Sequence, residues 1–209
     1  MYSQPELRAK RVFDVVAASV GLCAVAPVLA AVAVAVKSSS PGPILFRQSR
    51  VGLGGNDFKL LKFRSMRMSE GGPLVTAAND SRITRVGAFL RRTKLDELPS
   101  LLNVLRGDLS LVGPRPEVRR YVDLYPPADR QFLAQFRPGI TDPTTIRFRN
   151  EEQILERAQD RERTYVAEIL PIKLRMYRDY LEHASFANDF VILARTVRAI
   201  LMPSASPDE

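Results

Sequence analysis

The chain has 209 residues, which is enough for one compact domain with attached segments. Its 31 Lys and Arg residues outnumber 23 Asp and Glu residues, and this net charge of +8 suits a nucleic acid, an anionic membrane surface or a phosphorylated small molecule as partner. A single Cys and a single His exclude a disulfide framework and a zinc site built from Cys and His. Carboxylates, Arg, Lys and a bound divalent cation are therefore the groups left for chemistry.

The segment from Val12 to Val36 is almost wholly apolar and is long enough to cross a bilayer. Pro27 lies inside it, where a proline removes a backbone hydrogen bond and kinks a helix. The part before Pro27 would reach only about 22 Å, which is short of a hydrocarbon core of roughly 30 Å. Basic residues flank both ends, and the positive-inside tendency places both ends in the cytoplasm. We therefore predict a re-entrant membrane helix; a true span, a signal peptide and a buried core helix stay open.

A polar, turn-rich stretch over residues 38–43 follows the apolar segment. Two strand-like runs come next, over residues 44–51 and 58–64, and the glycine-rich turn between them predicts a β-hairpin. The turn lacks the Lys and Ser or Thr of a phosphate-binding P-loop. The basic residues of the second strand, Lys59, Lys62 and Arg64, could face either solvent or a membrane.

The rest of the chain is mostly helical in pattern. Apolar residues at helical spacing predict helices over residues 83–92, 98–106, 151–160, 165–183 and 186–202. The loop over residues 71–80 and the proline-containing stretches 126–127 and 137–143 are expected to be irregular. The expected fold class is α+β and mostly helical, with the re-entrant helix (1–40), a compact cytosolic catalytic domain with a short hairpin and amphipathic interfacial helices (41–202), and a disordered tail (203–209).

Two adjacent carboxylates, Asp96 and Glu97, lie at the expected start of the helix over residues 98–106. Neighbouring carboxylates repel each other, and a divalent cation or arginines relieve the repulsion. An ionised Asp held in this way can attack phosphorus. The same pair could simply cap the helix, because acids favour the first turn of any helix. Further along, Pro114 and Pro116 hold Arg115 in an extended backbone that presents its guanidinium to phosphate oxygens, unless it is a solvated loop residue.

Several short blocks occur together in this chain in a characteristic order. They are Lys-Arg-Val-Phe-Asp (10–14) with the later Pro27, Lys-Phe-Arg-Ser-Met (62–66), Leu-Asp-Glu-Leu-Pro (95–99), the run from Asn103 to Gly107, and Asp-Leu-Ser-Leu-Val-Gly-Pro-Arg-Pro (108–116). With these blocks the chain resembles the bacterial sugar transferases, the monotopic phosphoglycosyl transferases, over roughly residues 8–200. Such enzymes move a phosphosugar from a nucleotide-diphosphate sugar, usually uridine-linked, to polyprenyl phosphate, at the cytoplasmic face of the bacterial inner membrane.

The resemblance implies roles for individual residues. The family's Asp-Glu dyad matches Asp96 and Glu97: Asp96 would attack the sugar-bearing phosphate, release the nucleoside monophosphate, UMP for a uridine donor, and carry the phosphosugar until the lipid phosphate takes it. Mg²⁺ would neutralise the diphosphate with Asp96 as a ligand. Glu97 would orient the metal or assist proton handling. Lys62, Arg91 and Arg115 are assigned to phosphate contacts, and Pro27 to the break in the membrane helix.

One position departs from the family pattern. Many members have glycine after Pro-Gly-Ile-Thr, whereas this chain has Asp142 and then Pro143. The departure puts the preference for a particular sugar and nucleotide in question, but it leaves the Asp96–Glu97 dyad unchanged. Expected partners are the nucleotide sugar, polyprenyl phosphate and membrane lipids, with no nucleic acid, and a homodimer stays open. The rival hypothesis is a membrane-tethered basic binding module that recruits nucleic acid or acidic lipid without catalysis, and that would bind nucleic acid with steep salt dependence.

Overall fold

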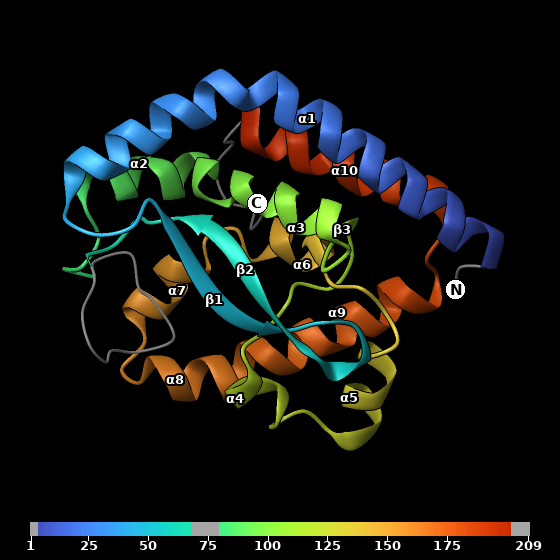
Figure 1. Ribbon diagram of the computed structural model, residues 1–209. Coiled ribbons are helices and arrows are strands. Elements are labelled where there is room, and N and C mark those ends of the chain that lie inside the picture. Colours follow the sequence, from blue (N-terminus) through green and yellow to red (C-terminus); the bar gives the residue numbers. More distant parts are fainter. Residues whose placement is uncertain (1–3, 68–79, 202–209) are drawn as a thin grey trace.

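The computed structural model describes residues 4–67 and 80–201, and shows a mostly helical protein with a small amount of sheet (Figure 1). The predicted tail over residues 203–209 lies outside the described residues, as does the predicted loop over 71–80 apart from Asp80. The helices and helical turns are α1 (Gln4–Ser39), η1 (Leu53–Gly55), α2 (Arg85–Thr93), η2 (Leu95–Ser100), α3 (Leu101–Arg106), α4 (Arg119–Val122), α5 (Pro127–Leu133), α6 (Pro143–Arg147), α7 (Glu151–Arg157), α8 (Arg161–Thr164), η3 (Tyr165–Ile169), α9 (Leu170–Glu182) and α10 (Phe186–Leu201).

The strands form two small sheets. The predicted hairpin is confirmed: β1 (Leu45–Val51) and β2 (Asp57–Phe63) pair antiparallel, with Leu45 opposite Phe63. The second sheet joins β3 (Ser110–Val112) and β4 (Gly139–Thr141) in parallel. The expectation that 126–127 and 137–143 are irregular is therefore wrong, since α5 begins at Pro127 and β4 lies within the second stretch.

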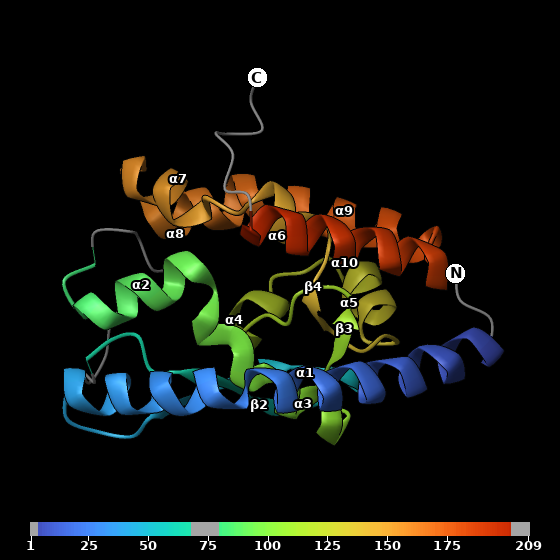
Figure 2. The same cartoon turned by 90° about the horizontal axis from the view of Figure 1, so that it is seen from above.

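Helix α1 is one continuous helix that includes Pro27, and it arches over the upper side of the molecule in Figure 1. Among the described residues it is the one helix long and apolar enough to cross a membrane. Viewed from above, α1 and α10 converge near the amino end of α1, where Phe13 packs against Phe186 and Phe190 (Figure 2). The outer surface of α1 is apolar and exposed, with its most exposed large side chains being Val12, Val16, Val20, Val28 and Val34.

Charged residues dock the amino-terminal half of α1 onto the domain. Lys10 pairs with the buried Asp189 of α10. Arg11 donates hydrogen bonds to carbonyl groups near the carboxyl end of α3. Asp14 is 2% exposed and accepts a hydrogen bond of 2.7 Å from the Ser110 hydroxyl. The Lys-Arg-Val-Phe-Asp block thus attaches α1 to three elements distant in sequence, because buried charges require partners.

The carboxyl end of α1 is attached by a residue of the hairpin. Arg64, 3% exposed, donates hydrogen bonds to the carbonyls of Val36, Ser40 and Pro43. A cation at a helix carboxyl end satisfies free carbonyls and matches the helix dipole. Arg64 therefore faces neither solvent nor a membrane, and both ends of α1 lie against the same domain.

The segment around the acid pair differs from its prediction. The expected helix over residues 98–106 is a 3₁₀ segment, η2, followed by the short helix α3. Lys94 ends α2 in the left-handed region with φ of 58°, which is rare for a residue with a side chain. The tight turn there places Asp96 and Glu97 ahead of the α-helix rather than in its first turn.

Candidate active site

Three elements bring four of the predicted site residues together. Glu97 of η2 lies between Lys62 of β2 and Arg115 of the loop after β3. The Lys62 ammonium lies 2.9 Å from the Glu97 carboxylate, and the Arg115 guanidinium pairs with the same oxygen. Asp96 directly precedes Glu97 in η2. Residues more than fifty positions apart in sequence thus form one cluster of two carboxylates and two cations.

Asn103, which is fully buried, holds β2 in place beside this cluster. Its side-chain oxygen accepts from the amide of Leu61, and its side-chain nitrogen donates to the carbonyl of Lys59. Both bonds go to backbone groups of β2 that shortly precede Lys62. Asn103 therefore fixes the register between β2 and α3, and with it the approach of Lys62 to Glu97.

The Pro-Arg-Pro loop is anchored by the residue that follows it. Glu117 pairs with Arg50 of β1 at 2.8 Å and accepts a hydrogen bond from the Tyr165 hydroxyl. Its own carbonyl accepts from the amide of Val51 at 2.9 Å. Arg115 is thus presented by a backbone held on both sides. Sequence reasoning did not assign a role to Glu117 or Arg50, and no local pattern signals a pairing 67 positions apart.

Two glycines allow the same loop to approach β4. A Cβ atom added at Gly139 would lie 2.1 Å from the amide nitrogen of Gly113, and one at Gly113 would lie 2.7 Å from the carbonyl oxygen of Arg137. Real Cβ atoms do not occupy such distances, so a side chain at either position would push the two segments apart. The glycines keep the Pro-Arg-Pro loop against the Pro138–Gly139 backbone.

Asp96 is 8% exposed, and its Oδ1 atom is buried without a hydrogen-bond partner among the described residues. Burial and the neighbouring Glu97 carboxylate raise the pKa of Asp96, and Lys62, Lys94 and Arg91 oppose this shift. An unpaired buried carboxyl oxygen is costly for a fold unless something else binds to it. This side chain is therefore prepared for a ligand.

Glu97 has the opposite electrostatic environment. Burial alone would raise the pKa of Glu97, but Arg115 and Lys62 outweigh it and hold that pKa well below its ordinary value. Burial lowers the pKa of Lys62, and Glu97 offsets part of that shift. The Glu97 carboxylate raises the pKa of Arg115. Glu97 is thus an ionised partner of two cations, while Asp96 has no such partner.

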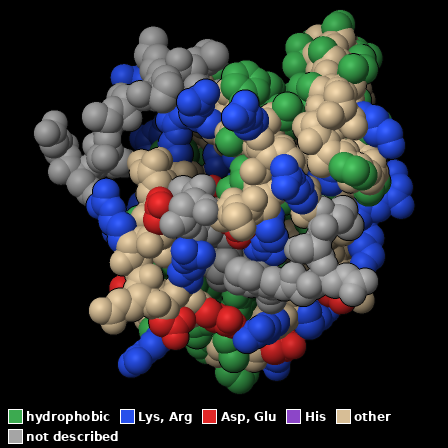
Figure 3. All heavy atoms as spheres, turned by 90° about the vertical axis from the view of Figure 1, so that its left-hand side faces the viewer, with side chains coloured by type: hydrophobic (Ala, Val, Ile, Leu, Met, Phe, Trp, Pro, Cys, Tyr) green, Lys and Arg blue, Asp and Glu red, His purple; other side chains and the backbone are tan. Residues whose placement is uncertain are grey.

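Arg91 lies outside this ion-pair cluster. Its guanidinium pairs with Glu152 of α7, and its Nε atom is buried without a partner among the described residues. Its charge still lowers the pKa of Asp96, although less than Lys62 and Lys94 do. Pro27 lies on α1 and takes no part in the cluster. Figure 3 shows Lys and Arg side chains spread over the face of the molecule that lies at the left of Figure 1.

The oxygen donors of this cluster decide whether it can hold a divalent cation. No group of three or more His, Cys, Asp or Glu side chains that could hold a metal occurs among the described residues. Asp96 Oδ1 is a free oxygen donor, whereas both Glu97 oxygens face cations. Mg²⁺ in phosphate-transfer sites keeps several waters and binds through one or two carboxylates plus substrate phosphates. The site fits Mg²⁺ held by Asp96 together with a diphosphate.

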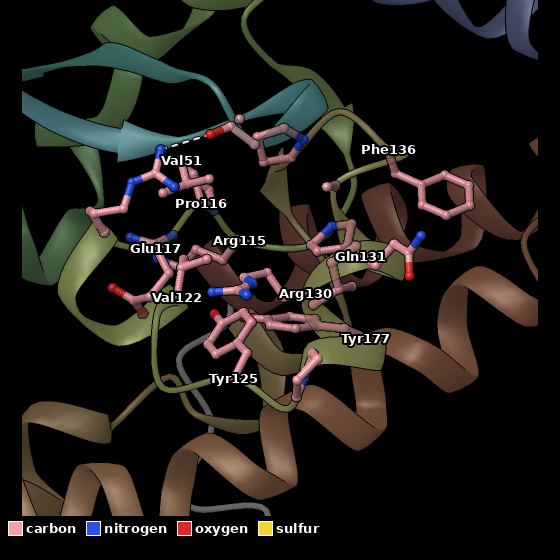
Figure 4. Close-up of a pocket in the computed structure, with 18 residues that line it drawn as sticks. Val51, Arg115, Pro116, Glu117, Val122, Tyr125, Arg130, Gln131, Phe136 and Tyr177 are labelled. Carbon is pink, nitrogen blue, oxygen red and sulfur yellow. Dashed lines mark hydrogen bonds between the residues drawn. The ribbon is translucent and has the colours of Figure 1, made fainter.

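A cavity of about 490 Å³ lies on one side of Arg115 (Figure 4). Its lining includes polar groups of Arg115, Glu117, Tyr125, Arg130 and Tyr177, and it is bordered by the β1–β2 turn, α4, α5 and α9. These elements lie on the lower side of the molecule in Figure 1, away from α1. The volume is within the range of small-molecule sites.

A second cavity, of about 160 Å³, lies beside Glu97. Leu98, Leu101, Ile140 and Ile146 provide most of its wall, and Ala199 of α10 closes one side. Two basic residues, Lys94 and Arg149, also line it. The two cavities differ in chemistry, the first rich in polar groups and the second mainly apolar.

Asp142, the departure from the family pattern, caps α6. The carboxylate is fully buried and accepts hydrogen bonds from the amides of Thr144 and Thr145, as expected for an Asp ahead of a proline-initiated helix. Burial raises the pKa of Asp142, and the threonine hydrogen bonds and Arg115 lower it. The position thus carries a structural role that sequence reasoning did not assign.

Comparison with known proteins identifies relatives. Residues 5–203 match the bacterial sugar transferase family. The chain is 43% identical over 196 residues to the UDP-glucose:undecaprenyl-phosphate glucose-1-phosphate transferase of Caulobacter vibrioides, covering 92% of this chain and 69% of that protein. It is 45% identical over 157 residues to the enzyme of the same name from Escherichia coli (73% and 34% covered), and 34% identical over 216 residues to the exopolysaccharide production protein ExoY of Rhizobium meliloti (95% and 88%).

The chain spans about two thirds of the Caulobacter protein and about a third of the Escherichia coli one. The family match over residues 5–203 includes all four residues of the cluster, Lys62, Asp96, Glu97 and Arg115. The chain therefore belongs to the bacterial sugar transferase family.

Proposed function

We propose that the protein transfers a phosphosugar from a UDP-sugar to polyprenyl phosphate, as the initiating membrane step of a glycoconjugate or exopolysaccharide pathway. The observation that carries this proposal is the unpartnered, buried carboxyl oxygen of Asp96 beside the Lys62–Glu97–Arg115 cluster. The names of the relatives support it, since they describe transfer of sugar phosphates from UDP-sugars to undecaprenyl phosphate.

In the first step, a carboxylate oxygen of Asp96 attacks the phosphorus that bears the sugar. A bond forms between that oxygen and phosphorus, and the bond from phosphorus to the bridging oxygen breaks. The nucleoside monophosphate leaves with the bridging oxygen and its electron pair. The product is a mixed anhydride between Asp96 and the sugar phosphate, which is covalent catalysis by a carboxylate.

In the second step, a phosphate oxygen of the lipid acceptor attacks the same phosphorus. The bond to Asp96 breaks, the carboxylate is regenerated, and the lipid diphosphate sugar forms. Charge on the phosphate oxygens grows in both steps, and Lys62 and Arg115 are positioned to stabilise it. Glu97 orients these two cations through its ion pairs rather than ligating a metal.

Bound Mg²⁺ would supply charge neutralisation of the diphosphate at the Oδ1 atom of Asp96. In the free protein the pKa of Asp96 is raised, and a cation at this oxygen would favour its ionised, nucleophilic form. The polar cavity beside Arg115 has the size and the hydrogen-bonding groups to accept the nucleotide sugar.

We further propose that α1 is a re-entrant helix at the cytoplasmic face of the inner membrane. Its exposed valines provide an apolar surface. Support comes from the attachments at both ends, Lys10 to Asp189 and Arg64 to the carbonyl of Ser40, because a helix that crossed the bilayer would carry one end about 30 Å away. Cysteines placed at both ends of α1 in a Cys23→Ser background should both be labelled in inverted vesicles; exclusive labelling of one end from the opposite side would indicate a true span.

The transfer itself is tested with UDP-[³H]glucose and undecaprenyl phosphate in detergent. The wild-type protein should release UMP and form a labelled lipid, and Asp96→Asn should do neither. Turnover by Asp96→Asn at the wild-type rate would overturn the covalent mechanism. Assays of UDP-glucose and UDP-N-acetylgalactosamine in parallel would identify the sugar, and sedimentation in detergent would test whether the protein is a homodimer.

A further inference from the structure

The mainly apolar cavity beside Glu97 is not needed to bind the nucleotide sugar. Sugars and nucleotides expose hydroxyl, amide and phosphate groups that require polar partners when buried. Leu98, Leu101 and Ile146 offer none from their side chains, and the threonine hydroxyls of the lining are bonded within the protein, Thr141 to Thr196 and Thr145 to Asp142. The cavity on the other side of Arg115 offers many. The Glu97–Arg115 ion pair thus has a polar cavity on one side and a mainly apolar cavity on the other. The proposed reaction has two substrates, one for each cavity.

We propose that this cavity binds the isoprenoid segment next to the phosphate of the acceptor lipid, and that Lys94 and Arg149 bind the phosphate itself. This inference rests on the proposed function and names the binding site of its second substrate. The volume of about 160 Å³ equals about five liquid-water volumes of roughly 30 Å³ each, which is on the scale of one five-carbon isoprene unit.

The position of the cavity agrees with a substrate that arrives from a membrane. Its walls come from η2, α3, β4, α6 and the carboxyl end of α10. Of these, α3 packs against α1, so the cavity lies on the side of the domain covered by α1, which carries the exposed valines. In Figure 1 this is the upper side, opposite α4, α5 and α9. An isoprenoid chain bound there would continue into the lipid next to α1.

The charges fit a phosphate at the inner end of such a chain. Lys94 lies two residues before Asp96 and lines the cavity together with Glu97. Arg149 faces the same cavity from beyond α6 and donates to the carbonyl of Ala199. A phosphate between Lys94 and Arg149 would therefore lie on the side of the Asp96–Glu97 pair that Glu97 presents to this cavity. Cations paired with phosphate form strong, charge-assisted hydrogen bonds.

The first test fills the cavity. Ala199→Trp should raise the KM for undecaprenyl phosphate at least tenfold and leave the KM for the nucleotide sugar within twofold. The matched control is Ala194→Trp, which places the same side chain on an exposed position of α10 outside the cavity lining. An Ala199→Trp protein with wild-type thermal stability and an unchanged KM for the acceptor would overturn the proposal.

The second test separates the contribution of the isoprenoid chain of the acceptor from that of its phosphate charge. Lys94→Gln should raise the KM for undecaprenyl phosphate while a burst of UMP without acceptor is still observed. Phosphatidic acid in mixed micelles is the competitor: weak inhibition supports an isoprenoid site, whereas inhibition equal to that by undecaprenyl phosphate would overturn it in favour of a general lipid site.

The third test is independent of turnover. A diazirine-bearing polyprenyl phosphate is photolysed with the full-length protein without nucleotide sugar, and crosslinks are mapped by mass spectrometry. Crosslinks at Leu101, Ile146 or Ala199 that are lost in Ala199→Trp support the proposal. Crosslinks confined to the valines of α1 overturn it. A wild-type protein that releases no UMP but crosslinks in the cavity would instead refute the proposed function alone.

Discussion

Glu97 and Arg115 form an ion pair that separates two unlike cavities. Arg115 lines the larger, polar cavity, and Glu97 lines the smaller, mainly apolar one. Lys62 joins the pair from β2. The covalent mechanism uses one phosphorus atom that meets two substrates in turn. Because the Glu97–Arg115 pair lies at the boundary of the two cavities, Lys62 and Arg115 stay near that phosphorus while the lipid acceptor replaces the leaving nucleotide.

The first prediction concerns Glu97. Glu97→Gln should lower kcat by about 100-fold or more, because both cations lose the charge that orients them. The covalent intermediate should still form, since Asp96 keeps its carboxylate. Rapid-quench measurement of UMP release, with the exposed Glu168→Gln as control, would test this. If the burst is lost as completely as in Asp96→Asn, Glu97 takes part in bond formation itself.

The second prediction concerns the metal. EDTA should abolish UMP release and Mg²⁺ should restore it, because the diphosphate otherwise adds negative charge next to Asp96. Mn²⁺ binding in the presence of UMP, followed by electron paramagnetic resonance, should weaken in Asp96→Asn far more than in Glu97→Gln. Equal weakening of Mn²⁺ binding in the two variants would mean that Glu97 is also a metal ligand. That result would contradict the expectation from the structure, in which both Glu97 oxygens pair with Arg115.

The hairpin and the apolar helix could be predicted from the sequence because each has a local signal. The structure brings Lys62, Asp96, Glu97 and Arg115 together, and the roles that the resemblance assigns to them stay predictions. What could not be predicted depends on tertiary contacts. The parallel pairing of β3 and β4 involves three residues on each side, too few for a periodic pattern.

The roles of several charged residues were equally hidden. Arg64 appeared to be a surface residue of the hairpin, but it is buried at the carboxyl end of α1. Arg91 pairs with Glu152, 61 positions away, and its assignment to substrate phosphate stays a prediction. Asp142 looked like a specificity change, whereas its carboxylate caps α6. For Arg64 and Arg91 the sequence shows the charge but not its distant partner.

The third prediction uses the pH dependence of Asp142. Its pKa is raised mainly by burial, so the folded protein binds this proton more tightly than the unfolded chain does. The contribution of Asp142 to stability therefore falls as pH rises from about 4 through the raised pKa. Asn also caps helices but does not ionise. Relative to the wild type, Asp142→Asn should gain thermal stability between pH 4.5 and pH 7.5. A difference in Tm that does not vary with pH would contradict the shift.

The fourth prediction separates docking of α1 from membrane binding. Asp14→Ala should leave the amide of Leu111 without its acceptor and the Ser110 hydroxyl with only the Val112 carbonyl, at a cost of about 1–3 kcal/mol. For a chain of this size that corresponds to a fall in Tm of roughly 2–12 °C in detergent. Val20→Asn, at a position 64% exposed, should leave Tm unchanged and reduce the fraction that sediments with vesicles.

The two variants serve as controls for each other. The α1 surface that carries Val20 faces away from the domain, so its apolar area can be lost without opening a buried hydrogen bond. Asp14 contributes no apolar area to a membrane, but it connects α1 to the strand that leads into the Pro-Arg-Pro loop. Asp14→Ala should therefore also lower kcat, through Arg115, whereas Val20→Asn assayed in detergent should not. A fall in kcat for Val20→Asn with unchanged Tm would mean that the exposed face of α1 takes part in the reaction.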